Sequence, residues 1–254
     1  MLTLRTHERI FTITLARPEK RNALNRAMAD ALVDAFDRAA RSDAKVIVLR
    51  AEGKAFSAGA DLDALRALQS ASHGDNLADS TATAAIFDAM LRHPKPIVSL
   101  IQGDAIAGGC GLATTADISI AVDTARFGYT ETSIGFVPAI VSGILQRKVG
   151  DTQARRLLLG AERISAAEAL KLGLVTEVVP AEELESRGLW WARRFVNDLS
   201  GSALARTKGL LAAQIGLPLD RQMALAIESN AQARADADCR EGVRRFLDNE
   251  TQRW

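Results

Sequence analysis

Cysteine is scarce in this sequence, and histidine and tyrosine are nearly as rare. The 254 residues include two cysteines, three histidines and one tyrosine. Cys110 and Cys239 are far apart, and neither lies near a run of metal-ligating side chains. This spacing argues against a disulfide framework and against a zinc site, and it is typical of reduced thiols in a reducing compartment. We therefore expect no metal centre.

The sequence also lacks a strong net charge and long apolar runs. Its formal net charge is +1, so no overall field draws the chain to nucleic acid or to a membrane surface. No apolar run approaches the roughly 20 residues that span a bilayer, and residues 1–9 lack the basic-then-apolar order of a secretory signal. We expect a cytoplasmic protein that binds neither nucleic acid nor a membrane.

Several common catalytic motifs are absent as well. No G-x-S-x-G elbow accompanies His7, His73 or His93, which disfavours a serine-hydrolase triad. His93 precedes Pro94 at the entrance to an apolar run, and we interpret it as a structural turn residue. The sequence contains no G-x-G-x-x-G motif after a strand and no Walker A motif. Dinucleotide and nucleoside triphosphate binding are therefore disfavoured.

What the chain does contain is an alternation of strand and helix patterns. Residues 10–15 alternate apolar side chains with threonine, and residues 45–50 and 96–101 are short β-branched runs bounded by turn formers. Residues 26–41 have the apolar spacing of an amphipathic helix. This order predicts a mixed α/β core with parallel strands. The length suits one sizeable domain, or a core with a small appendage.

After Gly150 the pattern becomes helical. Ser165 and Glu168 have the spacing of a capping box. Earlier in the chain, residues 70–76 form the clearest internal loop, which we expect to be mobile, and a helix is expected over residues 80–92. The helices predicted in the second half of the chain cover residues 154–159, 165–170, 181–199, 202–213 and 219–234.

Two turns of small residues carry the strongest chemical signal. Residues 56–62 and 106–112 each end an apolar run, and each can aim a backbone N–H at a shared point. Two N–H groups that converge on one carbonyl oxygen form an oxyanion hole, which stabilises negative charge on that oxygen in a transition state. The second turn continues into residues 112–116, which have the pattern of a helix start, where negative charge is favoured.

Four segments occur in one order and spacing: Arg17–Asn25, Lys54–Leu62, Pro96–Gly103 with the glycine-rich turn behind it, and Ala125–Glu131. Together they resemble the crotonase family, the enoyl-CoA hydratase/isomerase superfamily, over nearly the whole chain. The resemblance implies a crotonase-like ββα spiral core over residues 1–195 that holds the CoA and acyl site. It also implies a C-terminal helical trimerisation region over residues 196–254, packed against neighbouring subunits in a homotrimer or a dimer of trimers.

The resemblance assigns the catalytic roles to three residues. Glu131 matches the family's catalytic glutamate, and its apolar and small neighbours favour a raised pKa suited to a general base, although a surface or capping glutamate is the alternative interpretation. The backbone N–H groups of Ala60 and Gly108 match the oxyanion donors. Cys110 lies in the second turn without a histidine or lysine activator nearby, so we expect it to pack beside a helix.

The resemblance also implies a coenzyme A thioester as substrate and no separate cofactor. Lys20 and Arg21 would supply positive charge for the phosphates, although a solvated basic turn is the alternative. Lys208 is a further candidate in the tail. Asn249 stands where many hydratases have a phosphate-contacting lysine, which weakens the case for a phosphate contact from a neighbouring subunit. The full set of expected substrate contacts is Lys20, Arg21, Ala23, Leu24, Ala58, Asp61, Leu62, Ile106, Gly111, Pro138 and Phe246.

Gly111 is the main departure from the family pattern. Well-known hydratases carry a second glutamate three residues after the oxyanion glycine, and this chain has glycine there. Hydration commonly shares its proton transfers between two carboxylates, whereas moving a double bond needs only one base. The second acid is not visible in this sequence, because the other candidates are expected at helix caps and turns: Asp61, Asp104, Asp117 and Asp123.

Three functions therefore remain open. Reversible hydration of a 2-enoyl-CoA is the leading hypothesis, because residues 135–142 resemble family members named hydratases. The second is Δ3,Δ2-enoyl-CoA isomerisation on the same scaffold. The third is a non-catalytic acyl-CoA-binding protein, which the retention of Glu131 disfavours.

Overall fold

A six-stranded sheet forms the centre of the protein in a computed structural model that describes all residues, Met1–Trp254. Within this sheet only β1 and β2 pair in the antiparallel sense, and every other neighbouring pair is parallel. The predicted α/β core with parallel strands is therefore confirmed. The strands in sheet order are β1 (Leu2–His7), β2 (Ile10–Leu15), β3 (Val46–Ala51), β4 (Ile97–Ile101), β6 (Ile118–Val122) and β9 (Glu177–Val179).

A second, three-stranded sheet carries the segments that matter for chemistry. It consists of β5 (Ala105–Ile106), β7 (Arg126–Gly128) and β8 (Arg163–Ser165), in that order. Strand β5 leads directly into the second glycine-rich turn, and β7 leads toward Glu131. Because β5 and β7 are parallel neighbours, their carboxyl ends bring these two segments to the same place.

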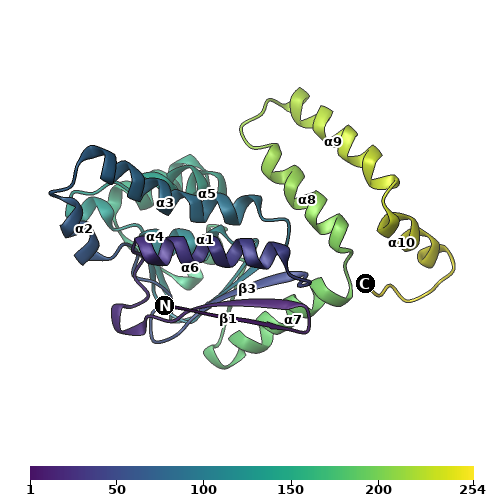
Figure 1. The fold of residues 1–254 in the computed structure, drawn as a ribbon, viewed down its shortest axis with the longest axis horizontal. Helices are drawn as coiled ribbons and strands as arrows, with labels where there is room; N and C mark the ends of the chain where they lie inside the picture. Colours follow the sequence, from purple (N-terminus) through teal and green to yellow (C-terminus); the bar gives the residue numbers. More distant parts are fainter.

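Helices cover the main sheet and form the tail. Figure 1 shows α1 and α3 on one side of the sheet and α7 on the other. None of the helices is both long and apolar enough to cross a membrane. The helices are η1 (Pro18–Lys20), α1 (Arg26–Arg41), α2 (Leu62–Leu68), α3 (His73–Arg92), α4 (Gly108–Thr115), η2 (Glu131–Ile134), α5 (Ala139–Gly160), α6 (Ala166–Lys171), η3 (Ala181–Glu183), α7 (Leu184–Asn197), α8 (Gly201–Ala213), α9 (Leu219–Arg234) and α10 (Ala237–Leu247).

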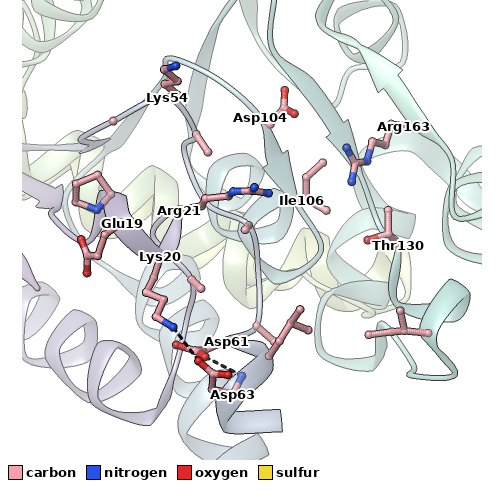
Figure 2. Close-up of a pocket in the computed structure, with 18 residues that line it drawn as sticks. Glu19, Lys20, Arg21, Lys54, Asp61, Asp63, Asp104, Ile106, Thr130 and Arg163 are labelled. Atoms are coloured by element: carbon pink, nitrogen blue, oxygen red, sulfur yellow. Dashed lines mark hydrogen bonds and ion pairs between the residues drawn. The ribbon is translucent and has the colours of Figure 1, made fainter. Parts of the chain in front are cut away.

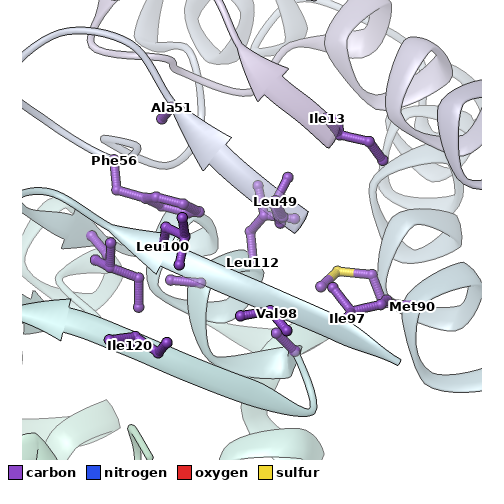
Figure 3. Close-up of a cluster of buried hydrophobic side chains, with 14 of the residues drawn as sticks. Ile13, Leu49, Ala51, Phe56, Met90, Ile97, Val98, Leu100, Leu112 and Ile120 are labelled. Carbon is purple, nitrogen blue, oxygen red and sulfur yellow. The ribbon is translucent and has the colours of Figure 1, made fainter. Parts of the chain in front are cut away.

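The hydrophobic core lies between the sheet and these helices. Figure 3 shows Ile97 of β4 beside Met90 of α3, with Leu49 of β3 in the same cluster of buried side chains. Strand β4 is buried along its whole length, because helices cover both faces of the parallel part of the sheet. Helix α7 approaches β4 closely at Gly188, where an added Cβ would stand 2.4 Å from Leu100 Cδ2.

The predicted loop over residues 70–76 is wrong for its second half. Helix α3 already begins at His73, because Ser72 and Asp75 form a capping box. Asp75 N donates to Ser72 Oγ at 3.1 Å, and Ser72 N donates to Asp75 Oδ2 at 3.2 Å. The small and polar residues that suggest a loop are here the start signal of a helix.

Two other helix predictions need correction. Glu168 N donates to Ser165 Oγ at 3.2 Å, but the Glu168 carboxylate accepts from Arg156 at 2.7 Å, so only half of the expected capping box forms. Helix α5 begins at Ala139, well before the predicted 154, and it runs through Gly150, whose φ of 76° interrupts the helical backbone. The glycines of this region interrupt the apolar pattern, so the pattern alone did not predict the start of the helix.

The tail helices α8, α9 and α10 extend away from the sheet (Figure 1). None of their residues is buried in the single chain. Their exposed large apolar side chains are Leu211, Leu219, Met223, Leu225, Ile227, Val243, Phe246 and Leu247.

Candidate active site

Two adjoining cavities open beside the turns that the sequence singles out. The larger has a volume of about 1080 Å³ and the smaller about 340 Å³. The smaller cavity is mostly apolar, whereas the larger is lined by several charged side chains. A ligand can extend from one into the other, because the two share Ala58, Ala60, Asp61, Leu62, Thr130 and Ile134.

The first turn is fixed by a buried asparagine. The side-chain NH₂ of Asn22 donates to the backbone carbonyls of Glu52 at 2.8 Å and Ala55 at 3.0 Å. The backbone carbonyl of Asn22 accepts from Ser57 Oγ at 2.8 Å. Further along, Leu24 N donates to Gly59 O and Asp61 N donates to Leu24 O.

These bonds hold the residues on either side of Ala60. The Ala60 N–H itself donates to no carbonyl or side chain of the protein. It is therefore a fixed donor that remains available at the cavity wall.

The second turn presents a matching donor. Ala107 N donates to Gly128 O at 2.7 Å, and Ala107 adopts φ 54° and ψ −131°, an unusual conformation for a residue with a side chain. Helix α4 begins at the next residue, Gly108, whose N–H also has no acceptor in the protein. Because the first N–H groups of a helix point out of its end, Gly108 offers its donor to the smaller cavity.

The two turns touch each other. A Cβ added to Gly59 would stand 2.7 Å from Ala107 Cβ and 3.2 Å from Gly108 N. Gly59 also has a φ of 84°, which a residue with a side chain rarely adopts. This close approach joins the two turns, and Ala60 and Gly108 both line the smaller cavity.

Glu131 lies in the wall of the same small cavity. It follows β7 at the start of η2 and is 8% exposed. Burial raises the pKa of Glu131, and no cation pairs with it. Its Oε2 is buried without any hydrogen-bond partner. A buried carboxylate oxygen without a partner costs stability, and such groups are common where a protein carries out chemistry.

Gly111 is buried behind the cavity wall. A Cβ at this position would stand 2.4 Å from Val141 Cγ1 and 3.1 Å from Phe87 Cε1. Val141 and Phe87 line the smaller cavity, and Gly111 does not. The space that a second glutamate would need is therefore occupied by two apolar side chains. Sequence reasoning missed this role of Val141, because the start of α5 was not predicted.

The larger cavity gathers most of the residues expected to hold the CoA. It is lined by Lys20, Arg21, Ala23, Ala58, Asp61, Leu62 and Ile106, and the smaller cavity adds Leu24 and Pro138. Lys20 Nζ lies 2.8 Å from Asp63 Oδ2, which raises the pKa of Lys20 (Figure 2). Asp61 pairs with Arg17 at 2.9 Å and caps α2 by accepting from Asp63 N.

Arg163 is a lining residue that the sequence did not reveal. Figure 2 shows Arg163 and Arg21 on opposite walls of the larger cavity, with both side chains directed toward Ile106. Neither guanidinium forms an ion pair, whereas Lys20 has one. The pairing of β7 with β8, which sets Arg163 opposite Gly128, brings this residue to the site from a distant part of the chain. Lys54 also lines the cavity.

Two tail residues do not reach the cavities of the single chain. Lys208 is wrong as a candidate there, because it forms a largely buried ion pair with Asp117 at 2.6 Å and donates to Lys95 O at 3.2 Å. Phe246 lies on α10, is 77% exposed and lines neither cavity.

The remaining reactive side chains have structural surroundings. Cys110 is fully buried in α4, and burial raises the pKa of its thiol to about 12, which leaves it protonated and a poor nucleophile. His93 is the C-cap residue after α3, and its ring contacts Phe36 O at 3.1 Å, while Lys95 N donates to its Nδ1 at 3.0 Å. Burial lowers the pKa of His93. No group of three or more His, Cys, Asp or Glu side chains is arranged to hold a metal ion.

Comparisons with known proteins identify the family of this chain. The family model for enoyl-CoA hydratase/isomerase matches residues 5–254. The chain is 37% identical over 249 residues to a Thermus thermophilus protein that carries a provisional enoyl-CoA hydratase name, a match covering 96% of this chain and 97% of that protein. It is 31% identical over 259 residues to the 2,3-dehydroadipyl-CoA hydratase of Escherichia coli, covering 98% and 96% of the two chains.

Solved structures show the same fold. The crystal structure of an enoyl-CoA hydratase from Mycobacterium smegmatis superimposes with a TM-score of 0.93 at 31% identity, over 100% of this chain and 98% of that one. The α/β core with C-terminal helices is thus the crotonase fold. The chain belongs to the enoyl-CoA hydratase/isomerase family.

Proposed function

We propose that this protein catalyses the reversible hydration of a 2-enoyl-CoA thioester, with Glu131 as its single acid-base group and the N–H groups of Ala60 and Gly108 as its oxyanion hole. The observation that carries the proposal is a buried carboxylate, with one oxygen free of hydrogen bonds, in one cavity with two unpartnered N–H donors. The hydratase names of relatives at 31% to 37% identity support it.

The mechanism follows from these groups. The thioester carbonyl oxygen accepts from both N–H donors, so the enolate charge that develops on it is stabilised. Glu131 takes a proton from water as the water oxygen bonds to C3, and the same carboxyl group then delivers a proton to C2. Burial raises the pKa of Glu131 above its ordinary value, which suits a group that must both accept and release a proton.

Isomerisation is the second candidate, and a specific observation favours it. Val141 and Phe87 fill the place of the second carboxylate, so the site holds one base in an apolar pocket. In this reaction Glu131 removes a proton from C2 of a 3-enoyl-CoA and returns it to C4, with the same enolate held by the oxyanion hole.

The larger cavity is our proposed site for the CoA portion. Arg21 and Arg163 are unpaired guanidinium groups, which suit phosphate oxygens, whereas Lys20 shares its charge with Asp63. The pantetheine would then run past Ile106 and Leu62 toward the shared wall at Ala60.

A paired assay tests the proposal. The purified protein is expected to hydrate crotonyl-CoA faster than it isomerises a 3-enoyl-CoA when both are followed spectrophotometrically. A faster isomerisation would select the second candidate. Binding of both thioesters without turnover would instead indicate a non-catalytic acyl-CoA-binding protein.

We further propose that the tail over residues 196–254 joins copies of the chain into a trimer or a dimer of trimers. Its exposed apolar side chains, Phe246 among them, are not buried within the single chain, and such a surface is typical of an interface with another protein surface. Light scattering of the purified protein measures the mass of the assembly directly.

We also place the protein in the cytoplasm, because Cys110 and Cys239 are both free thiols.

The raised pKa of Glu131 predicts a pH dependence of both rate and stability. The base must be ionised to accept a proton, so kcat/KM should begin to fall with decreasing pH at a pH above the usual glutamate pKa of about 4.3.

The same shift affects stability. Folding favours the protonated form of Glu131, so stability is highest below the pKa of Glu131 in the unfolded chain and falls as pH rises through its pKa in the folded protein. Glu131→Gln should therefore raise Tm at neutral pH, and the gain should shrink toward acid pH. If Glu131→Gln raised Tm by the same amount at every pH, the raised pKa of Glu131 would be contradicted.

Position 111 gives a test of the apolar wall. Gly111→Glu alone should lose activity and about 1–3 kcal/mol of stability, because its side chain collides with Val141. Combining it with Val141→Ala should recover stability and raise hydration relative to isomerisation. Val141→Ala alone is the control. If Gly111→Glu matches the parent protein in Tm, the packing of Val141 against Gly111 is wrong.

A further inference from the structure

Helix α3 gives the small, mostly apolar cavity one polar wall. Asp79, Ser80, Thr83 and Phe87 all line it. Asp79, Thr83 and Phe87 are spaced four residues apart, so they form a single stripe along the helix. The stripe runs from an aromatic ring at one end to a carboxylate at the other.

The polar members of this stripe have no partners within the protein. Asp79, Ser80 and Thr83 form no side-chain hydrogen bond, and Asp79 forms no ion pair. Polar residues on other faces of α3 do have partners: Thr81 Oγ1 donates to Leu77 O at 2.7 Å, and Asp88 accepts from Arg92 Nε at 2.6 Å. Asp79 and Thr83 are half-buried, whereas Ser80 is exposed, so Asp79 and Thr83 are the groups that a ligand in the cavity can supply with partners.

The stripe also fixes where Asp79 lies along the cavity. Phe87 packs against Gly111, in the helix that begins with Gly108, so Phe87 marks the end near the proposed oxyanion hole. Asp79 is eight residues earlier, which corresponds to a rise of about 12 Å along the helix. A zigzag carbon chain advances about 1.3 Å per bond, so roughly nine bonds separate these levels. Asp79 therefore lies level with the far end of a medium-length acyl chain.

No cation compensates this carboxylate. Arg26 is the basic residue tied to this part of α3, through a bond from Nη1 to Ala78 O at 3.4 Å, but its side chain pairs with Asp30 at 2.9 Å. Asn25 lines the same cavity, and its Oδ1 accepts from Met28 N, which leaves its NH₂ group available. The far end thus carries an unpaired carboxylate, with the Thr83 hydroxyl one turn nearer the proposed oxyanion hole.

We propose that Asp79 determines acyl-chain specificity and selects medium-length enoyl-CoA thioesters whose far end carries a hydrogen-bond donor, such as a hydroxyl group. This inference rests on the proposed function, because it places the acyl chain in the smaller cavity. A donor satisfies the carboxylate, an alkyl end leaves it without a partner, and a terminal carboxylate is repelled by it.

The experiment compares three C10 thioesters that differ only at the far end. The substrates are 2-decenoyl-CoA, its ω-hydroxy derivative and its ω-carboxy derivative, each measured as kcat/KM. The parent protein should prefer the ω-hydroxy substrate over the alkyl one by about tenfold and reject the ω-carboxy one. Asp79→Leu should reverse the preference toward the alkyl chain, and Asp79→Asn should relieve the rejection of the ω-carboxy chain.

Two controls separate the possible failures. Asp88→Asn, on the same helix but paired with Arg92 outside the cavity, should leave all three values unchanged. Crotonyl-CoA is too short to reach Asp79, so its turnover reports on the proposed function alone. Normal crotonyl-CoA turnover with no discrimination among the C10 substrates, or the same discrimination in Asp79→Leu, would overturn the specificity role. Absence of turnover on every enoyl-CoA would instead overturn the proposed function.

Discussion

Glu131→Gln is expected to lower turnover by a factor of about 10²–10⁴ while the affinity for CoA thioesters stays nearly unchanged. Glutamine keeps the size of the side chain but cannot accept and release a proton. Its carbonyl and amide groups remain in the cavity wall that Glu131 shares with Ala60 and Gly108. The substrate therefore still binds, and only the proton transfers fail.

The measurement is kcat on crotonyl-CoA and on a 3-enoyl-CoA, together with the Kd of a saturated acyl-CoA by calorimetry. Glu182→Gln is a matched control, because Glu182 is exposed and lines neither cavity. Near-normal turnover in Glu131→Gln would remove Glu131 from the mechanism. A large loss of affinity with unchanged kcat would assign it to binding instead.

The sequence was sufficient to predict which turns meet. The β-branched runs that became β2, β3 and β4 had to lie in one sheet, and each glycine-rich turn follows directly from such a run or from a short strand beside it. The resemblance to the crotonase family supplied the order of the segments. Local patterns together with this order were enough to bring Ala60, Gly108 and Glu131 to one cavity.

Residues brought in by strand register could not be predicted in this way. Arg163 reaches the larger cavity only because β8 pairs antiparallel with β7, and a three-residue strand leaves almost no pattern in a sequence. Lys208 is the opposite case, because the sequence suggested it as a phosphate contact and the structure places it elsewhere. It looked available for a phosphate, but Asp117, which also accepts from Ile97 N, holds it at the edge of the sheet.

The wall behind Gly111 shows how a missed helix start changes the chemistry. The glycines at 143 and 150 interrupt the apolar pattern, so the residues from Ala139 onward did not stand out as a helix. That first turn of α5 carries Val141 into the place where other family members have a carboxylate. The absence of the second glutamate was visible in the sequence, but the apolar side chain that replaces it was not.

Gly108→Pro is expected to remove about 3 kcal/mol of transition-state stabilisation, a loss of roughly two orders of magnitude in kcat, because it deletes one donor of the oxyanion hole. Proline suits this place in the fold. Gly108 is the first residue of α4, where the missing N–H breaks no helical hydrogen bond and the fixed φ of proline matches the helix. Ala107 before it has φ 54° and ψ −131°, outside the extended region that a residue before proline favours, so a lower Tm is expected for this variant.

Gly108→Ala is the matched control for this variant. Its Cβ would make an ordinary contact of 3.7 Å with Leu24 Cδ1, and it keeps the N–H. The alanine variant should therefore retain most of its turnover, while the proline variant loses it even at temperatures well below its own Tm. Comparing kcat and Tm of the two variants distinguishes the effect of losing the N–H donor from the effect of adding side-chain atoms at this position. If both lose activity equally, crowding of the thioester rather than loss of the N–H explains the effect. If the proline variant is folded and fully active, the oxyanion hole does not use Gly108.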